Sequence, residues 1–144
     1  MKIQIMATLM LFLATGCTAL NSPYANLQPE EAKERLAEMS QAELFEGIGW
    51  HGWNNENKGG KEVLKKEVLR RNSQWDAAVK QDVLAGFVKL GMTKNQVLAS
   101  WGKPQEINRT VFKEYQREQW VYQRGYQKGR YIYFVNDKVD SWQS

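Results

Sequence analysis

The stretch that decides the fold is Gly91-Met92-Thr93-Lys94-Asn95-Gln96-Val97-Leu98-Ala99-Ser100-Trp101-Gly102-Lys103-Pro104. Thr93, followed three residues later by Gln96, is the capping-box pattern of a helix N-terminus. The apolar residues that come next recur at helical spacing, which places Trp101 on the inward side. Gly102 and Pro104 are typical of a helix end. The stretch therefore predicts one short helix with an inward-facing apolar side.

Downstream of this helix, the sequence changes to the two-residue period of β-strands. Strands rich in aromatic and β-branched residues are predicted at 107–112, 118–124 and 130–135. A two-residue turn at Asn136-Asp137 then returns the chain along a fourth strand. Residues 87–142 therefore predict a short helix packed on an antiparallel meander, with Trp101, Trp120 and Phe134 in the core.

The same turn sets the register of the last two strands. The predicted cross-strand neighbours are Phe134 with Val139, Ile132 with Ser141, and Tyr131 with Trp142. In this register Tyr131, Tyr133 and Trp142 lie together on the outer face, where amphipathic aromatic side chains suit a docking surface for a protein or a lipid headgroup. The alternative is that helices formed by residues 29–72 cover this face.

Upstream of the deciding stretch, the sequence favours helices. Pro29 fits a first helical position, and the acidic residues that follow it suit the positive end of the helix dipole. Ser40 with Glu43 is a second capping box, which predicts that a new short helix begins there. The region before the sheet is therefore expected to be entirely helical apart from its connections.

Two further helices are predicted before the deciding stretch. One covers 61–72, and the next is capped by Ser73 with Asp76 and ended by Gly86. The basic residues of the first of these helices are Lys61, Lys65, Lys66, Arg70 and Arg71. Because acidic residues pair with some of them at four-residue spacing, they predict a solvated helix face.

Between Gly47 and Gly60 the glycine-rich sequence predicts a loop that carries Trp50 and Trp53. Two interpretations are open: the tryptophans pin the loop onto the domain, or they form a docking surface for a sugar chain, lipid headgroup or protein. His51 lies between them and is the only histidine, so it has no second histidine with which to build a zinc site. The sequence therefore predicts no metal site at His51.

Cys17 is the only cysteine, and it follows a charged start, an apolar run from Ile5 to Ala14, and Thr15-Gly16. Such a run is too short to span a bilayer and is typical of a secretory signal. The segment Ala14-Thr15-Gly16-Cys17 resembles a bacterial lipobox, which implies that Cys17 carries a lipid and becomes the mature N-terminus. A cleaved signal that leaves a free cysteine is the alternative, but an unpaired thiol in an oxidising compartment favours lipidation.

Length and charge set the organisation that follows from this signal. The 144 residues carry 20 basic and 16 acidic side chains, and removal of a signal containing Lys2 leaves 19 basic against 16 acidic. So mild a charge on an exported protein argues against a nucleic-acid partner. The predicted parts are a lipoprotein signal peptide at 1–16, a lipidated tether at 17–28, a helical region at 29–86 and a helix-plus-sheet domain at 87–144.

Several short motifs of the C-terminal part occur in a specific order and spacing. They are Gly91-Met92-Thr93, Gln96-Val97, Gly102-x-Pro104, Trp120-x-Tyr122 and Tyr131-Ile132-Tyr133-Phe134. With the lipobox at Cys17, they resemble the SmpA/OmlA domain of the BamE-like outer-membrane lipoproteins. The resemblance covers well under half of the chain and implies a small helices-on-sheet fold. With the helices predicted upstream, the expected fold class is α+β: N-terminal helices followed by a short helix packed on a three- to four-stranded antiparallel sheet. The resemblance also implies no catalysis, no cofactor, and binding of other envelope proteins or lipid.

The predicted function is that of a non-catalytic lipoprotein held by acyl chains at the periplasmic face of the outer membrane. Thr18, rather than an acidic residue, follows Cys17, and by resemblance to sorted lipoproteins this favours the outer membrane. The predicted role is a binding or scaffold module in outer-membrane protein assembly or envelope integrity. Its expected partners are the membrane, through the anchor at Cys17, and an envelope protein, lipid or peptidoglycan.

Two other classes stay open at this point. One is an inhibitor-like or peptidoglycan-binding periplasmic module, for which the sequence offers no discriminating loop. The other is a cell-wall hydrolase with two carboxylates, drawn from Glu46, Glu56, Glu114 and Glu118. Glu114 and Glu118 flank a predicted turn, where acidic side chains are ordinarily solvated, and no motif surrounds a serine nucleophile. We therefore predict that the protein is not an enzyme.

Overall fold

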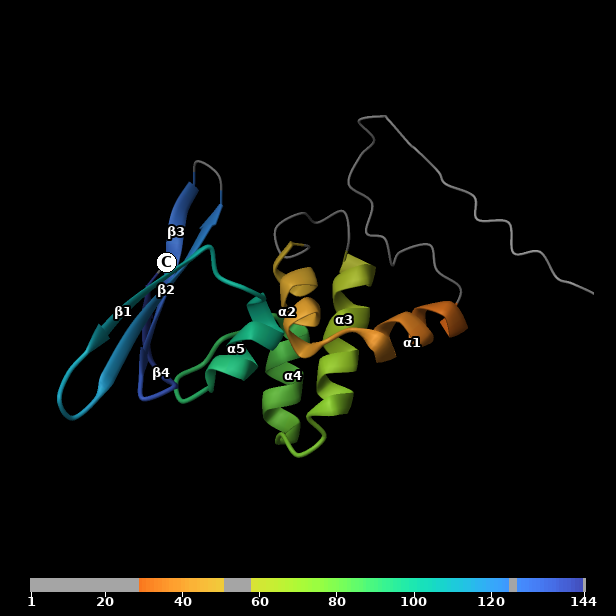
Figure 1. The fold of residues 1–144 in the computed structure, drawn as a ribbon, viewed down its shortest axis with the longest axis horizontal. Helices are drawn as coiled ribbons and strands as arrows, with labels where there is room; N and C mark the ends of the chain where they lie inside the picture. The colour runs from red at the N-terminus through yellow and green to blue at the C-terminus, as the bar shows by residue number, and fades with distance from the viewer. Residues whose placement is uncertain (1–28, 51–57, 125–126, 144) are drawn as a thin grey trace, which may run out of the picture.

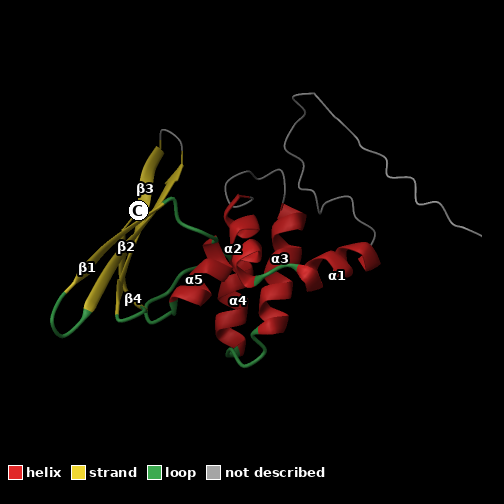
Figure 2. Ribbon diagram, viewed as in Figure 1, coloured by secondary structure: helices red, strands yellow, loops and turns green. Residues whose placement is uncertain are grey.

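The computed structural model describes residues 29–50, 58–124 and 127–143. The helices in these ranges are α1 (Pro29–Glu38), α2 (Gln41–Trp50), α3 (Lys58–Arg71), α4 (Ala77–Ala85) and α5 (Lys94–Trp101). The strands are β1 (Glu106–Val111), β2 (Gln116–Arg124), β3 (Gln127–Val135) and β4 (Lys138–Gln143). Helices thus precede an antiparallel sheet, as Figure 2 shows, and the predicted α+β fold is confirmed.

The sheet is a four-stranded meander in which the strands follow the order β1-β2-β3-β4. In Figure 1 α5 lies between the sheet and the other helices, and α1 lies at the opposite end of the molecule from the sheet. The capping box at Thr93 forms as predicted and starts α5. Just before it, Gly91 N–H donates to Val139 O and Val139 N–H donates to Met92 O, both at 2.8 Å, so the start of α5 is fastened to β4.

Two clusters of buried side chains meet at α5. The helical core comprises Leu36, Leu44, Phe45, Ile48, Leu64, Val68, Val83 and Ala99. The sheet core comprises Met92, Val97, Trp120, Tyr122, Ile132, Phe134 and Val139. Leu98 of α5 packs against both, and Trp101 packs half-buried against the sheet core. Trp120 and Phe134 are buried as predicted, and α5 is the element that joins the two cores.

The predicted loop from Gly47 to Gly60 is wrong at both of its ends. Helix α2 continues through Gly47 and Gly49 to Trp50, and α3 already begins at Lys58. For α2 the reason is packing of backbone on backbone: a Cβ on Gly102 would lie 2.0 Å from the Gly49 nitrogen, closer than any real contact. Because only glycine permits this approach, tertiary packing offsets the low helix propensity of the residue.

The predicted solvated face of α3 is also wrong at two positions. The Lys65 side chain is buried, and its ammonium group donates to Val83 O in the last turn of α4. The Arg71 guanidinium donates to Leu36 O and to Met39 O, where α1 ends, and pairs with Glu67. Each cation thus donates hydrogen bonds to carbonyl groups at the C-terminus of a neighbouring helix, where the helix dipole favours positive charge.

The predicted cap of α4 differs from the observed one. Asp76 occupies the N-cap position without a side-chain cap hydrogen bond, and Ser73 lies in the preceding turn. In that turn Trp75 N–H donates to Asn72 O, and Lys80 Nζ donates to Ser73 O, so local bonds organise the residues before the helix. The end of α4 at Gly86, with φ of 77°, is as predicted.

The register of the β3–β4 hairpin is partly wrong. The turn forms at Asn136 and Asp137, both with positive φ, and Phe134 opposes Val139 as predicted. A bulge between Tyr133 and Phe134 then shifts the pairing, so Ile132 opposes Trp142, and Tyr131 opposes Gln143. One extra residue on β4 therefore moves Trp142 to the other face of the sheet.

Candidate binding surface on the sheet

The bulge places Trp142 on the opposite face of the sheet from Tyr131 and Tyr133, although the sequence predicts all three on one docking surface. Tyr131 and Tyr133 lie half-buried on the outer face of the sheet. Tyr133 OH accepts a hydrogen bond from Gln119 Nε2 at 3.0 Å, and Asn108 Nδ2 donates to Gln119 Oε1, which makes a polar row across the strands. Trp142 lies on the helix-facing side and is 53 % exposed.

The other predicted site residues cannot be placed in this surface. Cys17 and Trp53 lie outside the described residues, and so does the side chain of Trp50, whose backbone ends α2. The last turns of α2, which precede Trp50, are held against the end of α5. Lys103 N–H donates to Phe45 O, and the Gly49 backbone lies against Gly102. The predicted role of the tryptophan pair stays a prediction.

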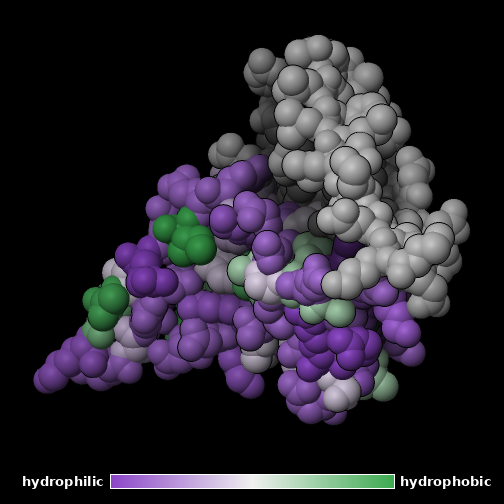
Figure 3. All heavy atoms as spheres, turned by 45° about the vertical axis from the view of Figure 1, so that its right-hand side comes forward, coloured by the Kyte–Doolittle hydropathy of each residue, from purple (hydrophilic) through white to green (hydrophobic). Residues whose placement is uncertain are grey.

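An exposed apolar surface that the sequence did not single out lies at the β1 edge of the sheet. Every residue of β1 is exposed, including Ile107 at 48 % and Val111 at 72 %. At the β1–β2 turn, Phe112 and Tyr115 are exposed and stack at 4.5 Å. Figure 3 shows strongly hydrophobic side chains set among hydrophilic ones on the sheet end of the molecule. The alternation in the sequence predicted the strand but carried no signal that α5 would leave it uncovered.

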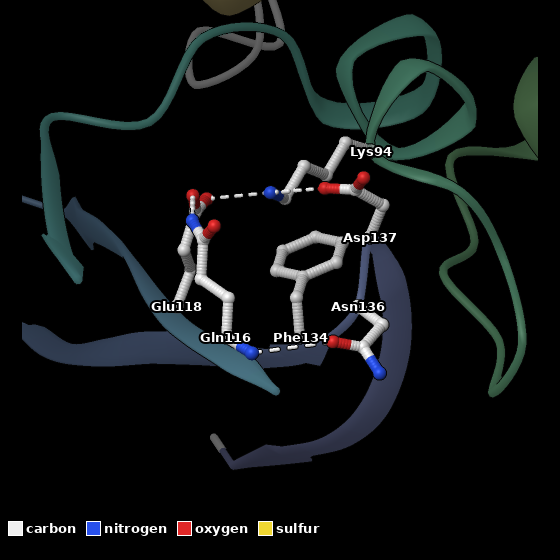
Figure 4. A pocket seen from close by; sticks show the side chains of 6 residues that line it. All are labelled: Lys94, Gln116, Glu118, Phe134, Asn136 and Asp137. Carbon is white, nitrogen blue, oxygen red and sulfur yellow. Dashed lines mark hydrogen bonds and ion pairs between the residues drawn. The ribbon is translucent and has the colours of Figure 1, made fainter. Parts of the chain in front are cut away.

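A buried carboxylate anchors α5 beside this surface. Glu118 on β2 is only 3 % exposed, and four donors surround it: Arg109 Nε at 2.7 Å, Gln116 Nε2 at 2.8 Å, Trp120 Nε1 at 2.9 Å and Lys94 Nζ at 3.0 Å. Lys94, the first residue of α5, also pairs with Asp137 in the β3–β4 turn (Figure 4). The expectation that Glu118 is solvated is therefore wrong, because α5 and β1 supply its partners.

Part of this network lines a hollow of about 160 Å³, whose lining residues are Lys94, Gln116, Glu118, Phe134, Asn136 and Asp137. In Figure 4, Lys94 reaches across the hollow, with Glu118 on one side and Asp137 on the other. The aromatic ring of Phe134 lies below the ammonium group, with its centroid 5.9 Å from Nζ. The hollow is thus spanned by an ion-pair network that ties the start of α5 to two places on the sheet.

The protonation states of this network follow from its contacts. Burial by itself would raise the pKa of Glu118, but hydrogen bonds from Trp120, Lys94 and Arg109 outweigh it and lower the pKa to about 2. Burial likewise disfavours the charge on Lys94, but its bonds to Asp137 and Glu118 raise the pKa of the ammonium group. Glu118 therefore stays ionised at neutral pH, which suits a structural clamp and not a general acid.

Within residues 29–50, 58–124 and 127–143, no cluster of three or more histidine, cysteine or acidic side chains could hold a metal ion. No helix in these ranges is long and apolar enough to cross a membrane. Comparison of the chain with models of known families, with curated proteins and with solved structures finds no match. The resemblance to the SmpA/OmlA domain thus stays a prediction from the motifs.

Proposed function

We propose that this protein is a lipid-anchored, non-catalytic binding module at the periplasmic face of the outer membrane, acting as a scaffold in outer-membrane protein assembly or envelope integrity. The observation that carries the proposal is the uncovered β1 edge with its exposed apolar side chains. Apolar residues gathered at one edge of a rigid sheet and rimmed by polar residues are typical of an interaction surface. The lipobox-like sequence at Cys17 supports the anchor and the compartment.

The position of this surface suits a tethered module. The described chain begins at Pro29, twelve residues after Cys17, and a segment of this length reaches at most about 40 Å when extended. Helix α1, where the tether ends, and the sheet lie at opposite ends of the molecule (Figure 1). An anchor at Cys17 would therefore attach at the end of the molecule away from the sheet. The β1 edge would stay accessible to an envelope partner.

The proposal is tested by fractionation of cells that express the tagged full chain. The wild type is expected in the outer-membrane fraction with lipid mass on its mature N-terminus, and Cys17→Ser in the soluble periplasm. Phe112→Ser is expected to stay membrane-bound and to lose an envelope protein that copurifies with the wild type. Leu84→Ser, which changes an exposed apolar residue of α4, is the matched control and should keep that partner. A soluble wild type, or equal copurification with both variants, contradicts the proposal.

A further inference from the structure

The outer edge of β1 has unpaired backbone groups at alternate residues. Among the described residues, β1 pairs only with β2, and Phe112 N–H donates to Tyr115 O at 2.8 Å. In an antiparallel ladder, pairs that exchange hydrogen bonds alternate with pairs that do not. Counting back from Phe112 in the observed register, Asn108 and Thr110 point their backbone groups towards β2. The N–H and C=O groups of Ile107, Arg109 and Val111 therefore point outwards, where a further strand could pair.

The side chains of these three residues form one row on the helix-facing side of the sheet. In the register Ile107 opposes Trp120, and Arg109 opposes Glu118, whose side chains lie under α5. Ile107 and Val111 are apolar and exposed, and Arg109, between them, is 59 % exposed. Arg109 reaches Glu118 through Nε. The edge thus presents the order apolar, cationic, apolar along its length.

We propose that β1 binds an extended segment of another protein as a fifth strand, and that this segment carries an acidic residue flanked two positions away on both sides by apolar residues. Side chains directly opposite each other in a sheet share a face, so the acid would lie beside Arg109, and the apolar residues beside Ile107 and Val111. The pattern is the same in both chain directions, so it does not depend on whether the added strand is parallel. Backbone bonds supply affinity, and the central charge pair supplies specificity.

Two other occupants fit the edge less well. A second copy that placed Ile107 opposite Val111 would bring Arg109 opposite Arg109 of that copy, and like charges directly opposite are destabilising. Residues 1–28 of the chain itself contain no acidic residue, so the tether cannot supply the partner of Arg109. Charge complementarity thus favours a segment from a different protein.

The inference rests on the proposed role as a binding module, and it is tested by NMR on the ¹⁵N-labelled full chain in detergent micelles. The probe is a blocked peptide of sequence Ser-Gly-Thr-Val-Thr-Glu-Thr-Val-Thr-Gly-Ser, and the control peptide has lysine in place of glutamate. We expect shifts centred on the amides of Ile107, Arg109 and Val111, with slowed exchange of these amide protons. The glutamate peptide should bind roughly tenfold more tightly, since one charge-assisted contact distinguishes the two.

Two variants make the test specific. Val111→Pro removes an outward N–H without removing a bond to β2, so it should keep the fold and lose both peptides. Arg109→Gln should keep weak binding but lose the preference for glutamate. Equal binding of the two peptides by the wild type, no binding, shifts away from β1, or self-association through β1 would each overturn the inference. Such failure would leave the proposed function standing if fractionation and copurification succeed.

Discussion

The helical core and the sheet core each bury one charged side chain, and they treat it in opposite ways. Lys65 and Glu118 are both 3 % exposed. Lys65 donates to the single carbonyl of Val83, and burial, followed by the nearby charge of Lys61, lowers its pKa to about 8. Glu118 receives hydrogen bonds from Trp120, Lys94 and Arg109, which outweigh its burial and keep it ionised. The comparison teaches that the partners of a buried charge, and not its burial, decide whether it stabilises the fold.

The largest expected effect breaks the link between the two cores. Gly102→Ala places a Cβ 2.0 Å from the Gly49 nitrogen, at a residue with φ of 78°, so α2 must move away from the end of α5. We expect a loss of about 4 kcal/mol in the free energy of unfolding, measured by thermal and urea melts.

Gly91→Ala is the matched control for this change. Gly91 has a similar φ of 80°, but nothing lies within 4 Å of an added Cβ. It should therefore lose only about 1 kcal/mol, the cost of the backbone conformation alone. Similar losses for the two variants would contradict the backbone contact between α2 and the end of α5.

The next effect concerns the sheet core. Glu118→Gln leaves Lys94 and Arg109 without their buried counter-charge, and we expect a loss of about 3 kcal/mol in unfolding free energy at pH 7. Glu114→Gln, at an exposed residue of the β1–β2 turn, should change it by less than about 0.5 kcal/mol. An unchanged melt for Glu118→Gln would show that the network does not hold α5 on the sheet.

Acid titration tests the stabilising role of the Glu118 charge without changing the side chain. The pKa of Glu118 is about 2 when folded, below its ordinary 4.5, so the folded chain binds fewer protons than the unfolded chain between these values. Its stabilisation is complete above pH 4.5 and is lost as the pH falls towards 2. Urea melts between pH 6 and pH 2 should show a steeper loss of stability for the wild type than for Glu118→Gln. Equal slopes would contradict an ionised Glu118.

The smallest effect lies in the helical core and has the opposite sign. The pKa of Lys65 is about 8 when folded, below its ordinary 10.5, so the charged form is disfavoured there and stability due to this group rises between pH 8 and 10.5. Lys65→Met should gain about 1 kcal/mol at pH 7 and lose this rise, because Val83 O still accepts from Gly86 N–H. Lys66→Met, at an exposed residue, is the control. A destabilised Lys65→Met would mean that the bond to Val83 outweighs desolvation.

The sequence predicted those elements whose signals are local. The capping boxes at Ser40 and Thr93, the helix start at Pro29 and the turn at Asn136-Asp137 all involve residues close together in the chain, and all are observed. The exception is the local cap predicted at Ser73 with Asp76, which does not form. The other features that the sequence missed depend on distant partners. The glycines of α2 read as a loop because their contact with the end of α5 has no local trace, and Lys65 resembled its solvated neighbours for the same reason.

For the candidate surface, too, the sequence predicted the local features and missed those that depend on contacts between distant residues. Period-two alternation predicted the strands and the inward positions of Trp120 and Phe134. It gave no hint of the bulge that turns Trp142 to the other face, because a bulge depends on how two strands pair and not on the composition of either. That β1 would be left uncovered was equally hidden, since the reach of α5 over the sheet is a property of the assembled fold.

The contact between Gly49 and Gly102 also sets an order of events in folding. It joins backbone segments about fifty residues apart, and closing so long a loop is entropically costly before other contacts exist. The meander pairs strands that follow one another in the chain. The hydrogen bond from Gly91 to Val139, which fastens α5 to β4, closes a loop nearly as long as the one between Gly49 and Gly102. We therefore expect the meander to form before either long-range contact, the fastening of α5 to β4 or the docking of α2 on the end of α5. Helix α2 would then dock only after the sheet that carries the β1 edge exists.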